Sequence, residues 1–132
     1  MKKLILITAL LISGSVFSQN KQEFGNWHYE YGEYQMQKSK ESDWKTEGKL
    51  GKTTIQFVKY KKSFYPVAEI SVVGELTKKY YVINGKKLKE GEHYCKLKSF
   101  DGVSYSELIV VEGEYAILLF SDGISRAVFY VK

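Results

Sequence analysis

Short apolar segments separated by glycine-containing turn signals dominate the second half of the chain. The segments are rich in Tyr, Val, Ile and Phe, which suit a pleated and half-buried surface. Asn-Gly and Asp-Gly favour hairpins because tight hairpin turns need positive φ. The signals are Asn84-Gly85, Glu90-Gly91, Asp101-Gly102, Glu112-Gly113 and Asp122-Gly123. This spacing predicts an antiparallel β-meander.

Polar and apolar positions alternate around one of these turns in a way that predicts its register. A two-residue turn at Asp101-Gly102 places Lys96 opposite Glu107. The same register places Cys95 opposite Leu108 on the other face. Opposite charges then share one face of the sheet and apolar groups share the other, as cross-strand pairs prefer.

Two further hairpins follow from the same rule. A turn at Asn84-Gly85 places Tyr81 opposite Leu88. Around Asp122-Gly123 the preceding segment, residues 115–120, is apolar on both faces. That pattern is typical of a central strand covered from two sides, or of a strand in contact with a second layer.

The first half of the chain is less regular. Aromatic and polar residues alternate from Trp27 to Tyr31, which predicts a strand that bends or bulges at Gly32. Residues 35–45 are polar and predict a long loop or a short surface helix, and residues 53–60 and 67–73 predict two more strands. We therefore expect an all-β protein with a meander of about eight strands, forming a closed or partly open barrel. A two-sheet β-sandwich is the alternative, because a meander serves both.

The first 18 residues have the layout of a secretory signal peptide. Lys2 and Lys3 precede an apolar run at residues 4–12, and small residues follow up to Ser18. The run is too short to span a bilayer, which needs about 20 residues. We expect residues 1–18 to be removed, leaving residues 19–132 as a single all-β domain that is exported to the periplasm or outside the cell.

Charge excludes some classes of partner. Without Lys2 and Lys3 the formal net charge falls from +5 to +3, and Arg126 is the only arginine in the chain. Bidentate contacts to phosphates and bases favour arginine, so we expect no nucleic-acid partner. Lys96 and Glu107 would lie mid-strand on a lipid-facing surface, which also argues against a membrane-spanning domain.

Lysines also occur in short runs, at residues 59–62, 78–79 and 86–89. Such runs either face an acidic surface or prevent unwanted pairing at strand edges. Both interpretations remain open from the sequence.

Catalytic and metal-binding groups are sparse. Cys95 is the only cysteine, so no intramolecular disulfide can form, and His93 lies two residues away on the same strand face. A metal site needs three or four converging ligands, and a cysteine nucleophile needs a third, orienting group. Cys95 is more simply a buried apolar residue. We predict no catalytic residue, no metal and no cofactor.

Aromatic residues supply the strongest candidates for a binding surface. Eleven of the residues are tyrosine, and aromatics cluster at residues 27–31, 64–65 and 80–81. Such groups either form a stacking platform for sugars or peptides, or fill the core with tyrosine hydroxyls reaching the surface. The candidate ligand-binding residues are Trp27, Tyr29, Tyr31, Tyr80, Tyr81 and Arg126.

Gly25-Asn26-Trp27, at the start of the first predicted strand, resembles the G-x-W signature of the calycins. In that family a basic residue on the last strand packs across the tryptophan, and Arg126 lies on the last predicted strand here. The resemblance implies an up-and-down barrel whose mouth binds a small apolar ligand or whose loops block an enzyme. A short chain of this kind could also fill its barrel with its own side chains.

Residues 24–32 and 80–87 are similar to fragments of MORN-type β-hairpin repeats. Such repeats recur at a fixed period, whereas the matching Gly32 and Gly85 are 53 residues apart. This resemblance comes second to the calycin one.

These observations favour an exported, non-catalytic β-domain that binds a ligand or a protein partner. The expected partner is a small apolar ligand, a sugar or a protein of the cell envelope. A structural or assembly component of the envelope is one alternative. A small secreted hydrolase is another, with His28, His93, Glu30 and Asp43 as the residues to replace in a test.

Overall fold

The computed structural model describes residues 21–132, which form ten antiparallel β-strands and no helix. All ten strands belong to a single sheet, with the order β1-β4-β5-β6-β7-β8-β9-β10-β2-β3. The strands are β1 (Lys21–Tyr29), β2 (Tyr31–Met36), β3 (Lys45–Leu50), β4 (Thr53–Tyr60), β5 (Val67–Val72), β6 (Lys78–Lys89), β7 (Glu92–Ser99), β8 (Tyr105–Val111), β9 (Tyr115–Leu119) and β10 (Ser125–Tyr130).

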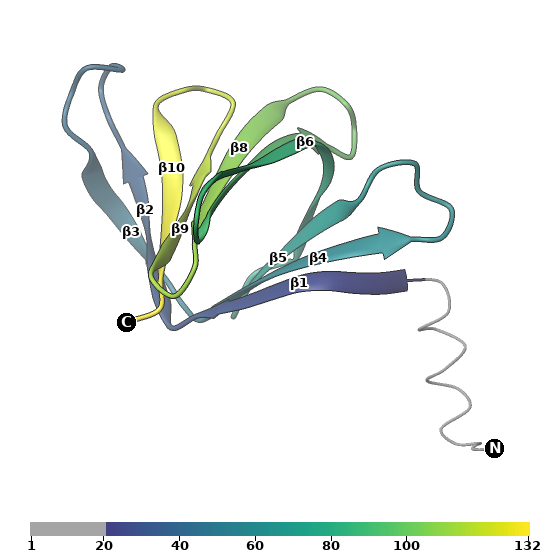
Figure 1. The fold of residues 1–132 in the computed structure, drawn as a ribbon. Coiled ribbons are helices and arrows are strands. Elements are labelled where there is room, and N and C mark those ends of the chain that lie inside the picture. Colours follow the sequence, from purple (N-terminus) through teal and green to yellow (C-terminus); the bar gives the residue numbers. More distant parts are fainter. Residues whose placement is uncertain (1–20) are drawn as a thin grey trace.

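The sheet curls into a partly open barrel because two long strands bend at one corner (Figure 1). Only Glu30 separates β1 from β2, although β1 pairs with β4 and β2 pairs with β10. Residues 51–52 join β3 to β4 at the same corner. The Glu30 amide donates to the Tyr130 carbonyl over 2.8 Å, which ties this corner to the last strand. The meander from β4 to β10 forms the rest of the wall.

The core lies inside this curl, where side chains from every part of the wall meet. Alternate positions along each strand point inward, as the pleat requires. Its central side chains Ile55, Leu97, Leu108 and Phe129 are almost wholly buried. The fold therefore has one apolar interior and an outer face that is mostly polar and aromatic.

The predicted register around Asp101-Gly102 is confirmed. Cys95 pairs with Leu108 and Lys96 pairs with Glu107. The connection is longer than the predicted two residues, since the ladder stops at Lys98 and Ser99 bonds to Ser104 across the turn. The other turns at residues 90–91, 112–113 and 122–123 are also present, and each has a glycine with positive φ.

The predicted hairpin at Asn84-Gly85 is wrong. Both residues lie inside β6, which runs without a turn from Lys78 to Lys89 and pairs with β7. Only residues 86–89 lie between this turn signal and the next one at Glu90-Gly91, too few for a full strand between two turns. The irregularity appears instead as a shift of register between Val82 and Asn84. Tyr81 consequently faces Lys98 and not Leu88.

Strand number and layering also differ from expectation in detail. The polar segment at residues 35–45 contains the end of β2 and a turn, and the unpredicted strand β3 begins at Lys45. In β9 the inward Ala116 and Leu118 are buried, whereas the outward Ile117 is only half-buried. No second sheet covers that face among residues 21–132, so the sandwich alternative is not what these strands form.

The predicted signal peptide, residues 1–18, lies outside the described residues. Within residues 21–132, no helix has the length and apolar character needed to cross a membrane. Residues 21–132 all belong to the one sheet and its connections.

Candidate functional site

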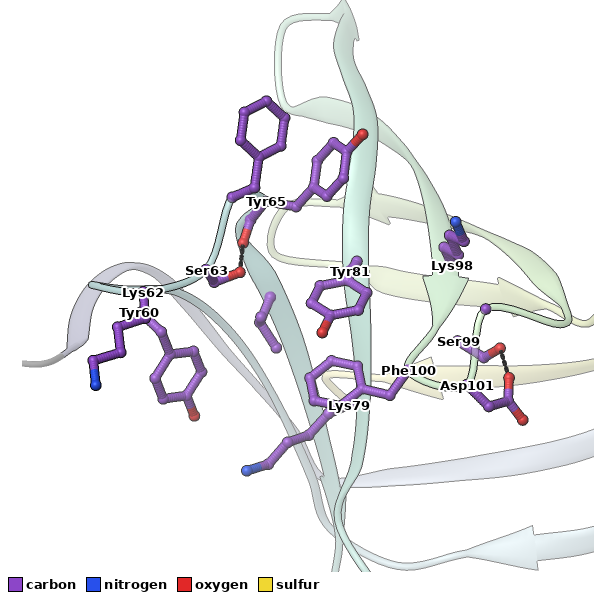
Figure 2. A pocket seen from close by; sticks show the side chains of 13 residues that line it. Tyr60, Lys62, Ser63, Tyr65, Lys79, Tyr81, Lys98, Ser99, Phe100 and Asp101 are labelled. Carbon is purple, nitrogen blue, oxygen red and sulfur yellow. Dashed lines mark hydrogen bonds between the residues drawn. The ribbon is translucent and has the colours of Figure 1, made fainter.

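The main candidate for a binding site in the described part of the molecule is a groove on the outer face of the sheet. It encloses about 690 Å³ between the β4–β5 turn and the β7–β8 turn (Figure 2). That volume lies within the range of small-molecule sites, roughly 300–1,000 Å³. Its lining residues are Tyr60, Lys62, Ser63, Phe64, Tyr65, Val67, Lys79, Tyr81, Lys98, Ser99, Phe100, Asp101 and Gly102. We call this site the outer groove.

Aromatic rings form the centre of the outer groove. Tyr81 on β6 points outward because its neighbour Tyr80 points into the core. The ring of Phe100 stacks on that of Tyr81, with centroids 4.4 Å apart and planes 19° from parallel. Tyr65 lies tilted beside Tyr81 at 6.3 Å, and Phe64 meets Tyr65 edge-on at 4.9 Å. Phe100 remains 48% exposed, so a flat ring backed by a second ring is open to a ligand.

The β4–β5 turn, which carries Phe64 and Tyr65, is held by its own side chains. The Lys59 ammonium donates to the carbonyls of Tyr60 and Ser63. The Ser63 hydroxyl donates to the Tyr65 carbonyl, as Figure 2 shows. These bonds satisfy turn carbonyls and fix the direction in which the two rings leave the sheet.

The β7–β8 turn, which carries Phe100, is fixed in a similar way. The Asp101 carboxylate accepts from the Ser99 hydroxyl and from the Val103 amide. These two donors hold the pKa of Asp101 below its usual value. Gly102 adopts φ +77°, a conformation that L side chains rarely adopt, which explains why glycine stands there. Phe100 therefore lies in a turn whose conformation is stabilised by these hydrogen bonds.

A buried carboxylate lies beside the outer groove, in contact with two of its lining residues, Tyr60 and Lys79. Glu69 on β5 is almost wholly buried and accepts a hydrogen bond from the Tyr60 hydroxyl. Lys79 approaches the same carboxylate at 3.9 Å. Burial and the Glu69 carboxylate raise the pKa of Tyr60 to about 12, so this hydroxyl stays protonated at physiological pH. Tyr60, Lys79 and Glu69 thus form a connected set of polar groups beside the aromatic centre.

The structure separates the six predicted site residues. Only Tyr81 lies in the outer groove. Tyr29 and Tyr80 are buried core residues, with 3% and 9% of their surfaces exposed. Trp27 lies on the inner side of β1, edge-on to Phe57 at 5.4 Å.

The other two candidates lie on the outer face at a distance from the groove lining. Tyr31 stacks on Tyr130, with centroids 5.0 Å apart, and donates to the carbonyl of Lys132. Arg126 lies over the ring of Trp44 at 4.1 Å. The calycin resemblance implied a contact between Arg126 and Trp27. In the structure Arg126 instead contacts Trp44, which lies in the connection between β2 and β3.

The local reason for the Gly25-x-Trp27 pattern is visible. A Cβ atom on Gly25 would lie 2.9 Å from two carbons of the Trp27 ring and 3.3 Å from Phe57. The indole therefore lies directly over the glycine two residues before it, on the same strand face. Glycine at this position leaves room for a large ring against the inner surface of β1.

Two smaller hollows lie at the ends of the interior. One of about 240 Å³ is lined by residues that include Trp27, Val82 and Cys95. The other, of about 120 Å³, is lined by residues that include Tyr34 and Leu76. Between them lie the buried side chains of the core, which pack against one another.

The groups considered for catalysis do not converge. The His93 imidazole pairs with the Glu112 carboxylate, and burial raises the pKa of the Cys95 thiol. His28, on β1, forms a hydrogen bond of 3.3 Å with the Thr54 hydroxyl on β4, away from His93 and Cys95 on β7. Among the described residues, no three His, Cys, Asp or Glu side chains gather in a way that could hold a metal ion.

Sequence reasoning missed Phe100, Lys98 and Asp101, whereas Lys62 and Lys79 lie in lysine runs for which an acidic partner was left open. Tyr81 carries a visible signal, because the consecutive Tyr80 and Tyr81 cannot both point inward on a strand. The aromatic pair 64–65 lies in the turn between β4 and β5. Phe100 stands alone beside a turn signal, and only the tertiary fold brings it onto Tyr81. Comparison with models of protein families, with curated proteins and with solved structures gives no match for this chain.

Proposed function

We propose that this protein is an exported, non-catalytic β-domain that binds a carbohydrate chain in the outer groove. The observation that carries the proposal is the Phe100–Tyr81 stack, which presents a rigid and half-exposed aromatic face inside a groove of about 690 Å³. The C–H groups of a sugar ring carry partial positive charge and pack favourably on the electron-rich face of an aromatic ring.

The sheet beneath the groove favours a sugar over an extended peptide. Peptides commonly bind such sheets by adding a strand to a free edge. The strands under the groove are internal, since Tyr81 on β6 pairs with Val67 on one side and with Lys98 on the other. The groove therefore offers aromatic ring faces and polar side chains to a ligand. The backbone amides and carbonyls of the strands beneath it already bond to neighbouring strands.

The groove is open along the outer face of the sheet, which suits a segment of a longer chain. Figure 2 shows the rings of Tyr65, Tyr81 and Phe100 arranged across it between the two turns. The hydrogen bonds within the turns on either side reduce the conformational entropy that is lost on binding. The predicted export of the protein would bring it into contact with the polysaccharides of an envelope or of the surroundings.

The test is calorimetric binding of short, purified oligomers of glucose, N-acetylglucosamine and galacturonic acid. Replacing Phe100 with alanine should weaken the binding of whichever oligomer associates by at least about tenfold, and Phe100→Tyr should retain it. Tyr31→Ala is the matched control, because Tyr31 is 44% exposed and also stacks on a neighbouring tyrosine. Equal losses in both variants, or binding that is insensitive to Phe100, would contradict the proposal.

A further inference from the structure

Three lysines surround the aromatic centre of the outer groove. Lys62 comes from the β4–β5 turn, Lys79 from β6 and Lys98 from β7. Figure 2 shows Lys62 and Lys79 on one side of the Tyr81–Phe100 stack and Lys98 on the other. A ligand that stacks on Phe100 therefore has an ammonium group within reach on both sides.

These ammonium groups are mostly without acidic partners. Among the side chains of residues 25–132, neither Lys62 nor Lys98 forms an ion pair with a carboxylate. Lys79 has Glu69 at 3.9 Å, the longest of the described ion pairs. Positive charge thus remains available at the rim, where an anion could be held in partly solvated form.

Asp101 is the one acidic side chain in the groove lining, and it offsets only one of the three lysine charges. The Asp101 carboxylate is engaged by the Ser99 hydroxyl and the Val103 amide within its own turn. The lining therefore carries three lysines against one carboxylate, and the Glu69 carboxylate beside the groove offsets part of the Lys79 charge. The electrostatic potential of the groove favours a negatively charged ligand.

We infer that the outer groove binds an anionic glycan, whose sugar ring stacks on Phe100 while its acidic groups meet Lys62, Lys79 and Lys98. This inference rests on the proposed carbohydrate binding and adds the charge class of the ligand. The shared chemistry is a sugar chain with carboxylate or sulfate groups. Lysine, a hydrated point charge, suits such exposed anions in an open groove.

Calorimetry with matched oligomers tests the inference. The probes are a short oligogalacturonate, the same oligomer with its carboxyl groups reduced to alcohols, a sulfated galactan oligomer and a polyglutamate peptide. The oligogalacturonate or the sulfated oligomer should bind about tenfold more tightly than the reduced oligomer at low salt. Added sodium chloride should remove most of this difference, because exposed charges are screened.

Variants separate the lysines from overall charge. The double variant Lys62→Gln with Lys98→Gln should weaken binding of the acidic oligomer about tenfold, as expected for two partly exposed ion pairs. The corresponding arginine double variant should retain binding. The double variant Lys38→Gln with Lys49→Gln removes the same charge from exposed positions outside the groove lining and should change affinity little.

The outcomes distinguish the two proposals. Binding of the sulfated oligomer alone assigns the anion to sulfate esters, and binding of the oligogalacturonate alone assigns it to uronates. Equal, Phe100-dependent binding of the reduced and acidic oligomers overturns the anionic class but leaves carbohydrate binding intact. Equal binding of polyglutamate overturns the inference in favour of a peptide. Absence of binding to every oligomer overturns both.

Discussion

The guanidinium of Arg126 lies 4.1 Å from the centre of the Trp44 ring, and its Nε donates to the Gln35 side chain over 2.7 Å. The contact joins the last strand to the connection between β2 and β3, which otherwise projects from the sheet edge. A cation over a tryptophan face is worth about 0.5–2 kcal/mol, depending on how far it is removed from water.

This contact should appear as coupling between the two residues. Arg126→Ala and Trp44→Ala should each lower the free energy of unfolding, and the double variant should lose about 1 kcal/mol less than the sum of the single losses. Urea unfolding of the four proteins of the cycle measures this coupling. Strictly additive losses would show that the two side chains do not stabilise each other.

Gly32 should be far less tolerant of alanine than Gly48, its near neighbour across the β2–β3 ladder. A Cβ on Gly32 would lie 2.8 Å from the carbonyl oxygen of Val128, a backbone atom that cannot easily move. A Cβ on Gly48 would meet nothing within 4 Å. Gly32→Ala should therefore cost about 2–3 kcal/mol of stability. Gly48→Ala should be neutral or stabilise slightly, because alanine restricts the unfolded chain.

Thermal and urea unfolding of the two glycine variants measures this difference. The result matters for the fold because Gly32 lies two residues after the corner at Glu30, where β2 lies against β10. Equal stability of the two variants would contradict the close approach of these strands.

Tyr29→Phe should stabilise the protein. The Tyr29 hydroxyl is buried and has no hydrogen-bond partner among the described residues. On folding, a buried hydroxyl without a partner loses its hydrogen bonds to water and forms none in the protein. Its removal should therefore add about 1 kcal/mol to the free energy of unfolding. Loss of stability in this variant would show that the hydroxyl has a partner, such as an internal water.

The same residue predicts sensitivity to alkali. Burial, with a smaller contribution from Glu112, raises the pKa of Tyr29 to about 12, against about 10 in an unfolded chain. Between these values the unfolded state has released the proton that the folded state keeps. Stability contributed by Tyr29 is thus fully present below pH 10 and is lost as the pH rises toward 12.

Urea unfolding at increasing pH tests this second effect. Tyr29→Phe should lose less stability than the original protein over this range. Tyr31→Phe, which changes an exposed ring, should follow the original protein. Identical pH profiles for all three would contradict a buried, neutral Tyr29.

The sequence predicted the β-architecture well because the signals for it are local. Glycines with positive φ at residues 91, 102, 113 and 123 end strands wherever they occur, and alternation then sets the register between Cys95 and Leu108. Asn84-Gly85 was misleading because the ladder between β6 and β7 satisfies its backbone and absorbs the extra residue as a bulge. Strand β3 carries few apolar residues, so nothing in its composition marks it as a strand.

The site was harder to predict because it is made by tertiary proximity. The sequence shows Tyr80 and Tyr81 as one aromatic pair, whereas the pleat sends the first into the core and the second to the surface. Trp27, Tyr29 and Tyr31 share a strand pattern, but the corner at Glu30 separates Tyr31 from the other two. Phe100 and Lys62 reach the groove from two turns that are distant in the sequence.

The most direct test of the account is a map of amide chemical shifts in the ¹⁵N-labelled protein during titration with an oligogalacturonate. We expect the changes to concentrate at Tyr65, Tyr81 and residues 98–102, with little change at interior residues such as Leu97 and Phe129. Changes centred instead on the Trp27 end of the interior, or no changes with any acidic or neutral oligomer, would contradict binding in the outer groove.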